Sequence, residues 1–216
     1  MTTSPEPARH QLRALISVTS KHNLVPFCRG LVKLGYELVS TGGTARELKA
    51  ADIPVTDVAT VTGHPEVLDG RVKTLHPKIH GGLLADRDNS AHQKHMTEHN
   101  IAAFHLLCVN LYDFKGQAAG KNLSPNEAIE FIDIGGPAML RAAAKNHRQV
   151  LPVVDPSDYD GVLAALEKGT VTDETRRRLA VKVFQTTAQY DQMIATYLAQ
   201  DSDAPKWQTW EPVQKL

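Results

Sequence analysis

The sequence predicts an α/β fold in three layers, with a parallel sheet lying between two layers of helices. Several short apolar runs, rich in branched side chains, have the length of buried strands. Segments of helical character separate these runs, and strands that alternate with helices form parallel sheets covered on both faces. The expected strands are 12–18, 36–40, 53–58, 104–110 and 150–154.

Start and stop signals place the helices. Asn23 can cap a first helix, Pro26 is tolerated in its first turn, and Gly35 can end it. Residues 132–147 are predicted to be a turn that feeds an alanine-rich helix, which has a proline near its first position. The segment 60–82 has little periodicity and much Gly, Pro, His and charge, which predicts a long loop, and loops of that length are usually functional or disordered. Further helices are expected at 45–51, 91–99, 124–130, 156–168 and 173–199.

The chain of 216 residues suits one large α/β domain with a small helical extension. We expect an N-terminus without order (1–11), an α/β domain (12–150), a helical extension packed on it (151–200) and a tail (201–216) that contains Trp207 and Trp210.

The charge balance excludes several classes of partner. Lysine and arginine number 24, as do aspartate and glutamate, so no net field attracts nucleic acid or a membrane. No apolar run is long enough to span a bilayer, and the first residues lack the pattern of a secretion signal. Cys28 and Cys108 lie on apolar segments, which favours buried thiols over a disulfide and fits a reducing cytoplasm.

Two short polar loops follow predicted strands and suit a phosphate monoester. Thr41-Gly42-Gly43-Thr44 lies between a strand and a helix, where backbone N–H groups and the helix dipole favour an anion. After the first strand, Thr19, Ser20 and Lys21 add hydroxyl groups and a positive charge. Ligands of parallel sheets bind beyond the carboxyl ends of the strands. Each segment alone is also compatible with an ordinary tight loop.

Two further segments carry groups suited to catalysis. In residues 70–82, apolar side chains alternate with Arg71, Lys73 and other basic residues, which indicates either an anion clamp held in place or a solvated basic loop. Asp133 precedes a Gly-Gly turn, and Lys145 follows near the end of the next helix. Asp133 is either a helix cap or a carboxylate that handles protons, and Lys145 is either a surface cation or an acid–base group.

A histidine cluster is the remaining candidate. His92, His95 and His99 could share one helix face, but zinc sites usually draw ligands from a second segment, so we favour a solvent-facing helix. The sequence contains no Walker loop, dinucleotide fingerprint or Gly-x-Ser-x-Gly elbow.

These motifs together resemble the IMP cyclohydrolase domain, which forms the amino-terminal part of the bifunctional purine-synthesis protein. The resemblance covers roughly residues 12–200. It rests on LISVTSK, STGGTA, EVLDGRVKTLHPKIHGGLLA, VNLY, IDIGGPAMLRAAAKNH and TAQYD, and the pair GRVKTLHP and IDIGG…RAAAKNH is highly specific.

The resemblance implies a methylglyoxal-synthase-like fold with appended C-terminal helices. It implies that 5-formamidoimidazole-4-carboxamide ribotide (FAICAR) is cyclised to IMP with loss of water, without a cofactor or metal, by a cytoplasmic homodimer. The catalytic residues that it implies are Lys145, Asp133, Lys73 and Tyr112. The nucleotide-binding residues that it implies are Thr19, Ser20, Lys21, Thr41, Gly42, Gly43, Thr44, Arg71, Val72, Thr74, Val109, Asn110 and Ile134.

The sequence departs from the family pattern in three ways. Asp113 replaces the expected proline of NLYPF, Phe131 stands where a polar residue is expected, and the formyltransferase part is missing, so we expect no formyl transfer. Three rival functions stay open: a module that binds a phosphorylated effector without catalysis, a phosphate-eliminating lyase, and a metal hydrolase that uses the histidines.

Overall fold

The structure, a computed structural model, describes residues 11–112, 114, 116 and 123–199. Its sheet has five parallel strands in the order β3-β2-β1-β4-β5. The chain thus moves outward from β1 to β3 and then returns to the other side of β1. The strands are β1 (Arg13–Ser17), β2 (Glu37–Ser40), β3 (Thr56–Asp57), β4 (Leu106–Val109) and β5 (Leu151–Val153).

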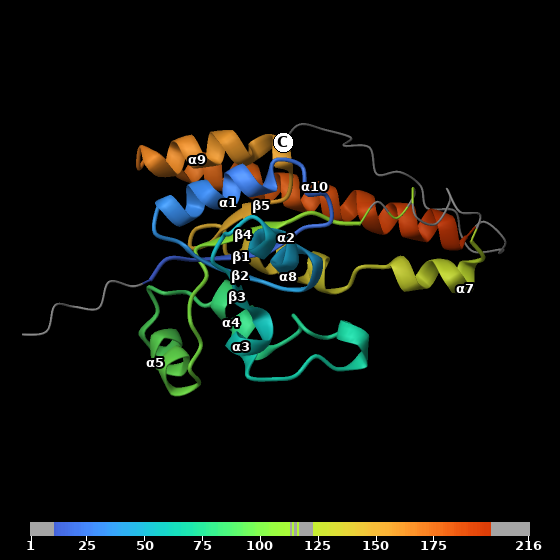
Figure 1. Ribbon diagram of the computed structural model, residues 1–216, viewed down its shortest axis with the longest axis horizontal. Helices are drawn as coiled ribbons and strands as arrows, with labels where there is room; N and C mark the ends of the chain where they lie inside the picture. Colours follow the sequence, from blue (N-terminus) through green and yellow to red (C-terminus); the bar gives the residue numbers. More distant parts are fainter. Residues whose placement is uncertain (1–10, 113, 115, 117–122, 200–216) are drawn as a thin grey trace, which may run out of the picture.

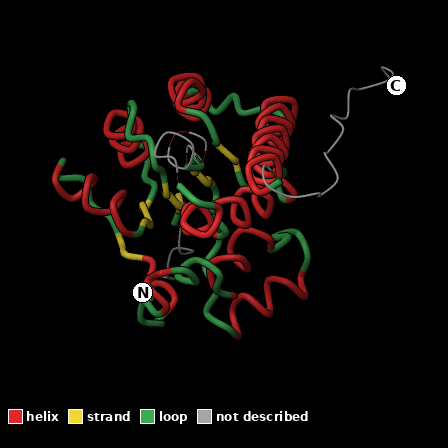
Figure 2. The backbone as a smooth tube through the Cα atoms, turned by 90° about the vertical axis from the view of Figure 1, so that its right-hand side faces the viewer, coloured by secondary structure: helices red, strands yellow, loops and turns green. Residues whose placement is uncertain are grey.

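Helices cover both faces of this sheet (Figures 1 and 2). Alternate residues of one strand point to opposite faces. In β1, Ile16 packs in the core beneath α1 (Leu24–Lys33) and α9 (Tyr159–Glu167), whereas Leu15 packs in the core beneath α4 (Pro77–Leu84) and α8 (Gly135–Lys145). The three-layer α/β architecture is therefore confirmed.

The other helices complete the two layers and their edges. The long helix α10 (Asp173–Leu198) packs against α8 and β5. The remaining elements are α2 (Gly42–Ala50), α3 (Val58–Thr62), η1 (Leu68–Gly70), α5 (Ser90–Glu98), α7 (Pro125–Ala128), η3 (Ile129–Phe131) and η4 (Pro156–Asp158).

The prediction of one long loop over 60–82 was wrong at both ends. Helix α3 extends to Thr62, and α4 begins at Pro77. Helix α4 forms because His76 Nδ1 accepts the N–H of Lys78 at 3.1 Å and because Ile79 and Leu83, four residues apart, are fully buried.

Two smaller predictions have different outcomes. Asn23 does precede α1, but it has a left-handed backbone and its side chain makes no capping hydrogen bond, so the predicted cap is wrong. Cys28 and Cys108 are free and buried, as predicted. Burial raises the pKa of the Cys108 thiol to about 12.

Three further expectations concern the histidine cluster, membrane-spanning helices, and Asp113 with the segments at the chain ends. Helix α5 exposes His92, His95 and His99, as expected. No helix in the described ranges is long and apolar enough to cross a membrane. The expectations for 1–10, Asp113 and the tail lie outside the described residues.

Candidate active site

A cavity of about 610 Å³ lies beyond the carboxyl ends of β1, β2 and β4. The strand order reverses between β1 and β4, and this is where parallel sheets bind ligands. The cavity is lined by Ser17, Val18, Thr19, Lys21, Thr41, Gly42, Gly43, Thr44, Asp69, Gly70, Arg71, Lys73, Thr74, Asn110, Tyr112, Ile129, Glu130, Ile132, Asp133, Ile134, Gly135, Gly136 and Met139.

The amino terminus of α2 forms one side of the cavity, which is the candidate anion-binding side. Thr41 is the one residue between β2 and α2. Helix α2 begins at Gly42, whose φ of +55° suits glycine. The first backbone N–H groups of a helix have no partner within the helix, and its dipole favours negative charge there. Gly42 and Gly43 both line the cavity, so their part of α2 is suited to a phosphate group.

Lys21 and Thr44 join the loop after β1 to α2. The Thr44 hydroxyl accepts the N–H of Val18 at 3.1 Å and donates to the Val18 carbonyl at 2.9 Å. The Lys21 ammonium donates to Thr44 Oγ1 at 3.0 Å and to the same carbonyl. Burial lowers the pKa of Lys21, and the nearby Glu47 opposes this effect. This cation is therefore fixed at the edge of the anion-binding side.

Asn110 shapes the loop at the point where the strand order reverses. Its Oδ1 accepts the N–H groups of Thr19 at 2.6 Å and Ser20 at 3.1 Å, and its Nδ2 donates to the Ser20 carbonyl at 3.1 Å. The side chain after β4 thereby fixes the backbone after β1, where Thr19 lines the cavity.

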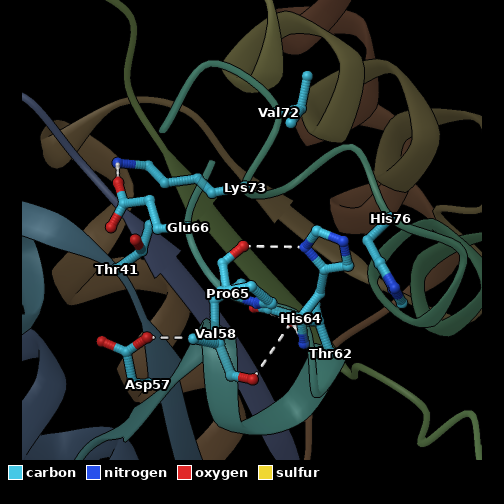
Figure 3. A pocket seen from close by; sticks show the side chains of 11 residues that line it. Thr41, Asp57, Val58, Thr62, His64, Pro65, Glu66, Val72, Lys73 and His76 are labelled. Carbon is cyan, nitrogen blue, oxygen red and sulfur yellow. Dashed lines mark hydrogen bonds and ion pairs between the residues drawn. The ribbon is translucent and has the colours of Figure 1, made fainter. Parts of the chain in front are cut away.

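Lys73 lies between the anion-binding side and the rest of the cavity. Its Nζ forms an ion pair with Glu66 Oε1 at 3.4 Å (Figure 3). A Cβ atom on Gly42 would lie 3.4 Å from Lys73 Nζ, and one on Gly70, where φ is +81°, would lie equally near Nζ and would overlap Glu66. The two glycines therefore leave room for this ion pair. A small adjoining pocket of about 30 Å³ shares Thr41 and Lys73 with the cavity (Figure 3).

Asp133 faces the cavity from the other side, where α8 begins. Its Oδ1 accepts the N–H of Gly136 at 2.8 Å, so it caps the first turn of α8. No described residue donates to Oδ2. Burial raises the pKa of Asp133, while the Gly136 N–H and the charge of Lys73 oppose the rise. A partly buried carboxyl group whose pKa is raised is a stronger base once it is ionised, and such groups gather at active sites.

The rim of the cavity carries a second ion pair. Arg71 and Glu130, which are 59 positions apart in the sequence, join their side chains there. Tyr112 is 47% exposed and Ile134 is 60% exposed, so both present surface to a ligand. The arrangement thus offers donors for an anion at one end, a carboxylate and a phenol at the other, and the Lys73 ammonium between them.

Most residues expected at the site line this one cavity. These are Thr19, Lys21, Thr41, Gly42, Gly43, Thr44, Arg71, Lys73, Thr74, Asn110, Tyr112, Asp133 and Ile134. Three others lie close by but do not line it. Ser20 is bound to Asn110, Val109 is buried in β4, and Val72 lines the small pocket.

The placement expected for Lys145 beside Asp133 needs correction. Lys145 is the last residue of α8, whereas Gly135 at the start of that helix lines the cavity. A rise of 1.5 Å per residue separates these two backbone positions by about 15 Å. Lys145 is exposed and does not line the cavity. Within the single chain, the helix that carries both groups keeps them apart.

Sequence reasoning missed several lining residues. Gly135 and Gly136 stood in the recognised turn but were not assigned to the site, and Glu66 had no signal that linked it to Lys73. The missed lining residues are Ser17, Val18, Asp69, Gly70, Ile129, Glu130, Ile132, Gly135, Gly136 and Met139.

Comparison with known families agrees with this geometry. Residues 23–138 match the MGS-like domain family. The chain belongs to the MGS-like domain family. Residues 143–216 of this MGS-like chain match the AICARFT/IMPCHase bienzyme family. The methylglyoxal-synthase-like fold and the resemblance to the IMP cyclohydrolase part of the bifunctional protein are thereby confirmed.

Curated relatives match this chain over most of its length. The MGS-like chain is 56% identical over 186 residues to "Bifunctional purine biosynthesis protein PurH" of Lactiplantibacillus plantarum, covering 86% of this chain and 36% of that protein. It is 57% identical over 187 residues to the protein of that name from Halalkalibacterium halodurans, covering 86% and 37%. The chain thus spans about a third of the length of these relatives.

A solved structure matches over nearly its whole length. The crystal structure of ForH is 38% identical in sequence and has a TM-score of 0.77, covering 87% of this chain and 98% of that chain. The fold of the chain is therefore similar to one that is known from experiment.

Proposed function

We propose that this MGS-like chain is an IMP cyclohydrolase, which closes the ring of FAICAR to give IMP and water. The observation that carries the proposal is the single cavity in which the start of α2 faces Asp133, with Lys73 between them. The match to bifunctional purine-synthesis relatives supports the same reaction.

The first task of the site is to fix the substrate. The phosphate would bind the N–H groups of Gly42 and Gly43, with the Thr41 hydroxyl and the Lys21 charge beside it. The carboxamide nitrogen and the formyl carbon already belong to one molecule, so much of the entropic barrier to their meeting is removed. The protein has to hold the formamido group in the rotamer that allows ring closure.

The second task is to manage charge during ring closure. As the carboxamide nitrogen attacks the formyl carbon, the nitrogen loses a proton and the formyl oxygen gains negative charge. Asp133 would accept the proton, because burial raises its pKa and its Oδ2 has no donor among the described residues. Lys73 and Tyr112 would donate protons to the oxygen, so that it leaves as water. The formamido nitrogen gives up its own proton as the C–O bond breaks and the C=N bond of the new ring forms, so two protons leave the two nitrogens and two reach the departing oxygen. This scheme has no step at Lys145.

The test is turnover of FAICAR by the purified chain, with IMP separated and quantified over time against an enzyme-free control. We expect IMP to form in proportion to enzyme, in equal amount to the FAICAR consumed. Binding of IMP without any turnover of FAICAR would instead indicate an effector-binding module. Release of methylglyoxal from dihydroxyacetone phosphate would indicate the lyase.

We also propose a homodimer in the cytoplasm. The family resemblance supports the dimer, and two free buried thiols suit a reducing compartment. Light scattering should give twice the chain mass of 23.7 kDa, and a value equal to the chain mass would contradict the dimer.

A further inference from the structure

Tyr190 connects the long helix α10 to the backbone of Asp133. Its side chain is 2% exposed, and its hydroxyl accepts the N–H of Asp133 at 2.7 Å. The same hydroxyl donates to the Phe131 carbonyl at 3.5 Å. One buried oxygen therefore bridges two backbone groups just before α8, although it is 57 positions away from Asp133 in the sequence.

Asp133 is consequently held from two directions. Tyr190 fixes its main chain from α10, and the Gly136 N–H fixes its carboxylate from α8. Together these bonds restrict both the backbone position and the direction of the carboxylate. Catalytic groups need placement to within about half an ångström, and such placement depends on hydrogen bonds from behind the reacting side chain.

The surroundings of Tyr190 form a small core separate from the two cores of the sheet. It consists of Tyr190, Phe114 and Ala128, with Phe131, Ile132, Ile194 and Tyr197 packed against it among other side chains. The Tyr197 hydroxyl donates to the Leu123 carbonyl at 2.5 Å, and its ring meets Phe114 edge-on at 5.4 Å. Figure 1 shows α7, which carries Ala128, near the carboxyl-terminal part of α10.

This small core supports one wall of the cavity. The wall carries Tyr112, Ile129, Glu130, Ile132 and Asp133, all of which line the cavity. The amino-terminal part of α10, by contrast, packs Leu179, Ala180 and Val183 into the two cores of the sheet. Helix α10 therefore anchors in the main fold and extends to the active site.

We propose that Tyr190 is a positioning residue for the cyclisation, which holds Asp133 in its reactive orientation through the backbone N–H. The inference rests on the proposed function and adds that α10, which follows the part matched to the MGS-like family, completes the active site. Tyr190 acts through Asp133 and does not line the cavity.

The test compares Tyr190→Phe with Tyr197→Phe in the full chain. Both variants keep the aromatic ring and lose one hydroxyl hydrogen bond in the same small core, but only Tyr190 contacts Asp133. We expect Tyr190→Phe to lower kcat for FAICAR by about 10- to 100-fold with KM changed less than about threefold, and Tyr197→Phe to change kcat less than about twofold. Equal kcat in Tyr190→Phe and the unaltered chain would overturn the inference, as would equal losses in the two variants.

A second readout does not depend on activity. Hydrogen exchange at the Asp133 amide, followed by NMR, should be slow in the unaltered chain and in Tyr197→Phe, and much faster in Tyr190→Phe. Fast exchange in the unaltered chain would overturn the inference even if Tyr190→Phe folds too poorly to assay. If the unaltered chain does not convert FAICAR, the proposed function is rejected. The exchange experiment still tests the hydrogen bond between Tyr190 and the Asp133 N–H in that case, so the two failures can be distinguished.

Discussion

At the scale of single residues, Asp133 is the lining residue on which the proposed reaction depends most. Burial raises its pKa, and Lys73 and the Gly136 N–H limit the rise. Because the pKa is raised overall, the ionised carboxylate is a stronger base than that of an exposed aspartate. Glu66, the carboxylate that forms an ion pair with Lys73, does not line the cavity, and its side chain is 55% exposed.

The Asp133→Asn substitution tests this role directly. The amide can still accept the Gly136 N–H but cannot accept a proton, so we expect kcat to fall by about 10²- to 10⁴-fold with little change in IMP affinity.

The unaltered chain should also show the carboxyl group in its pH profile. Because the base must be ionised and its pKa is raised, kcat should fall as the pH drops through a value above the usual aspartate value of about 4. A kcat that stays constant down to pH 4 would contradict the assignment of Asp133.

The residue types at this site were predictable, but their partners were not. Asp133, Lys73 and Tyr112 each stand in a recognisable motif, and the cavity contains all three. Nothing in the sequence linked Tyr190 to Asp133 or Glu66 to Lys73, because these contacts depend on how separate segments pack. Lys145 does not line the cavity of the single chain for the converse reason, since a shared motif does not bring together groups at opposite ends of a helix.

Helix starts are the decisive feature at the scale of elements. Both α2 and α8 begin at the cavity, so the first turns of two helices lie where a ligand would bind. The β2-to-α2 connection was predictable from its glycines and threonines. Helix α4 was missed because its Gly, Pro and His content outweighed the spacing of Ile79 and Leu83, although Pro77 at the first position was a usable signal.

Gly42→Ala tests the anion-binding helix start. At a φ of +55° a side chain adds strain of about 1–2 kcal/mol, and the new Cβ would lie 3.4 Å from Lys73 Nζ. Turning the backbone to relieve the strain would move the N–H groups away from the phosphate, so the Kd for IMP in calorimetry should rise by roughly 5- to 30-fold. Gly43→Ala is the matched control, because its Cβ would meet only Arg46 Nη2 at 3.8 Å. Equal affinities for the two variants would contradict this role of Gly42.

Lys145→Ala tests whether the far end of α8 takes part in catalysis. An exposed ammonium about 15 Å from the start of the helix should contribute only to the helix dipole, so we expect kcat to stay within about threefold. A fall of 10²-fold or more, measured at saturating FAICAR, would contradict the single-chain geometry. Such a fall would place Lys145 at a cavity in another arrangement, such as that of a second copy.

The whole molecule joins its parts through α10. This helix packs against α8 and β5, and its Lys182 forms ion pairs at 2.7 Å with Asp155 and with Asp158, just before α9. The parallel sheet and its helical layers were predictable from alternating patterns of about the right length. The hydrogen bond by which α10 reaches Asp133 was not predictable, because helical periodicity shows that one face of a helix is buried but does not show which residues pack against it.

Asp155→Asn tests the acid sensitivity of this junction. Hydrogen bonds from Lys182 and from the Ser157 N–H lower the pKa of Asp155 to about 2. A lowered pKa contributes stability above the unfolded value of about 4, and this stability is lost as the pH falls towards 2. The group is 41% exposed, so we expect the substitution to lower the free energy of unfolding by less than about 1 kcal/mol at pH 7. Urea titrations should show this difference vanish near pH 2, and an equal difference at both pH values would contradict the ion pair.

The most direct measurement is a crystal structure of the chain with IMP bound. We predict the phosphate at the N–H groups of Gly42 and Gly43 and the six-membered ring beside Asp133, Lys73 and Tyr112. IMP bound elsewhere, or in this cavity with its base turned away from Asp133, would contradict the account.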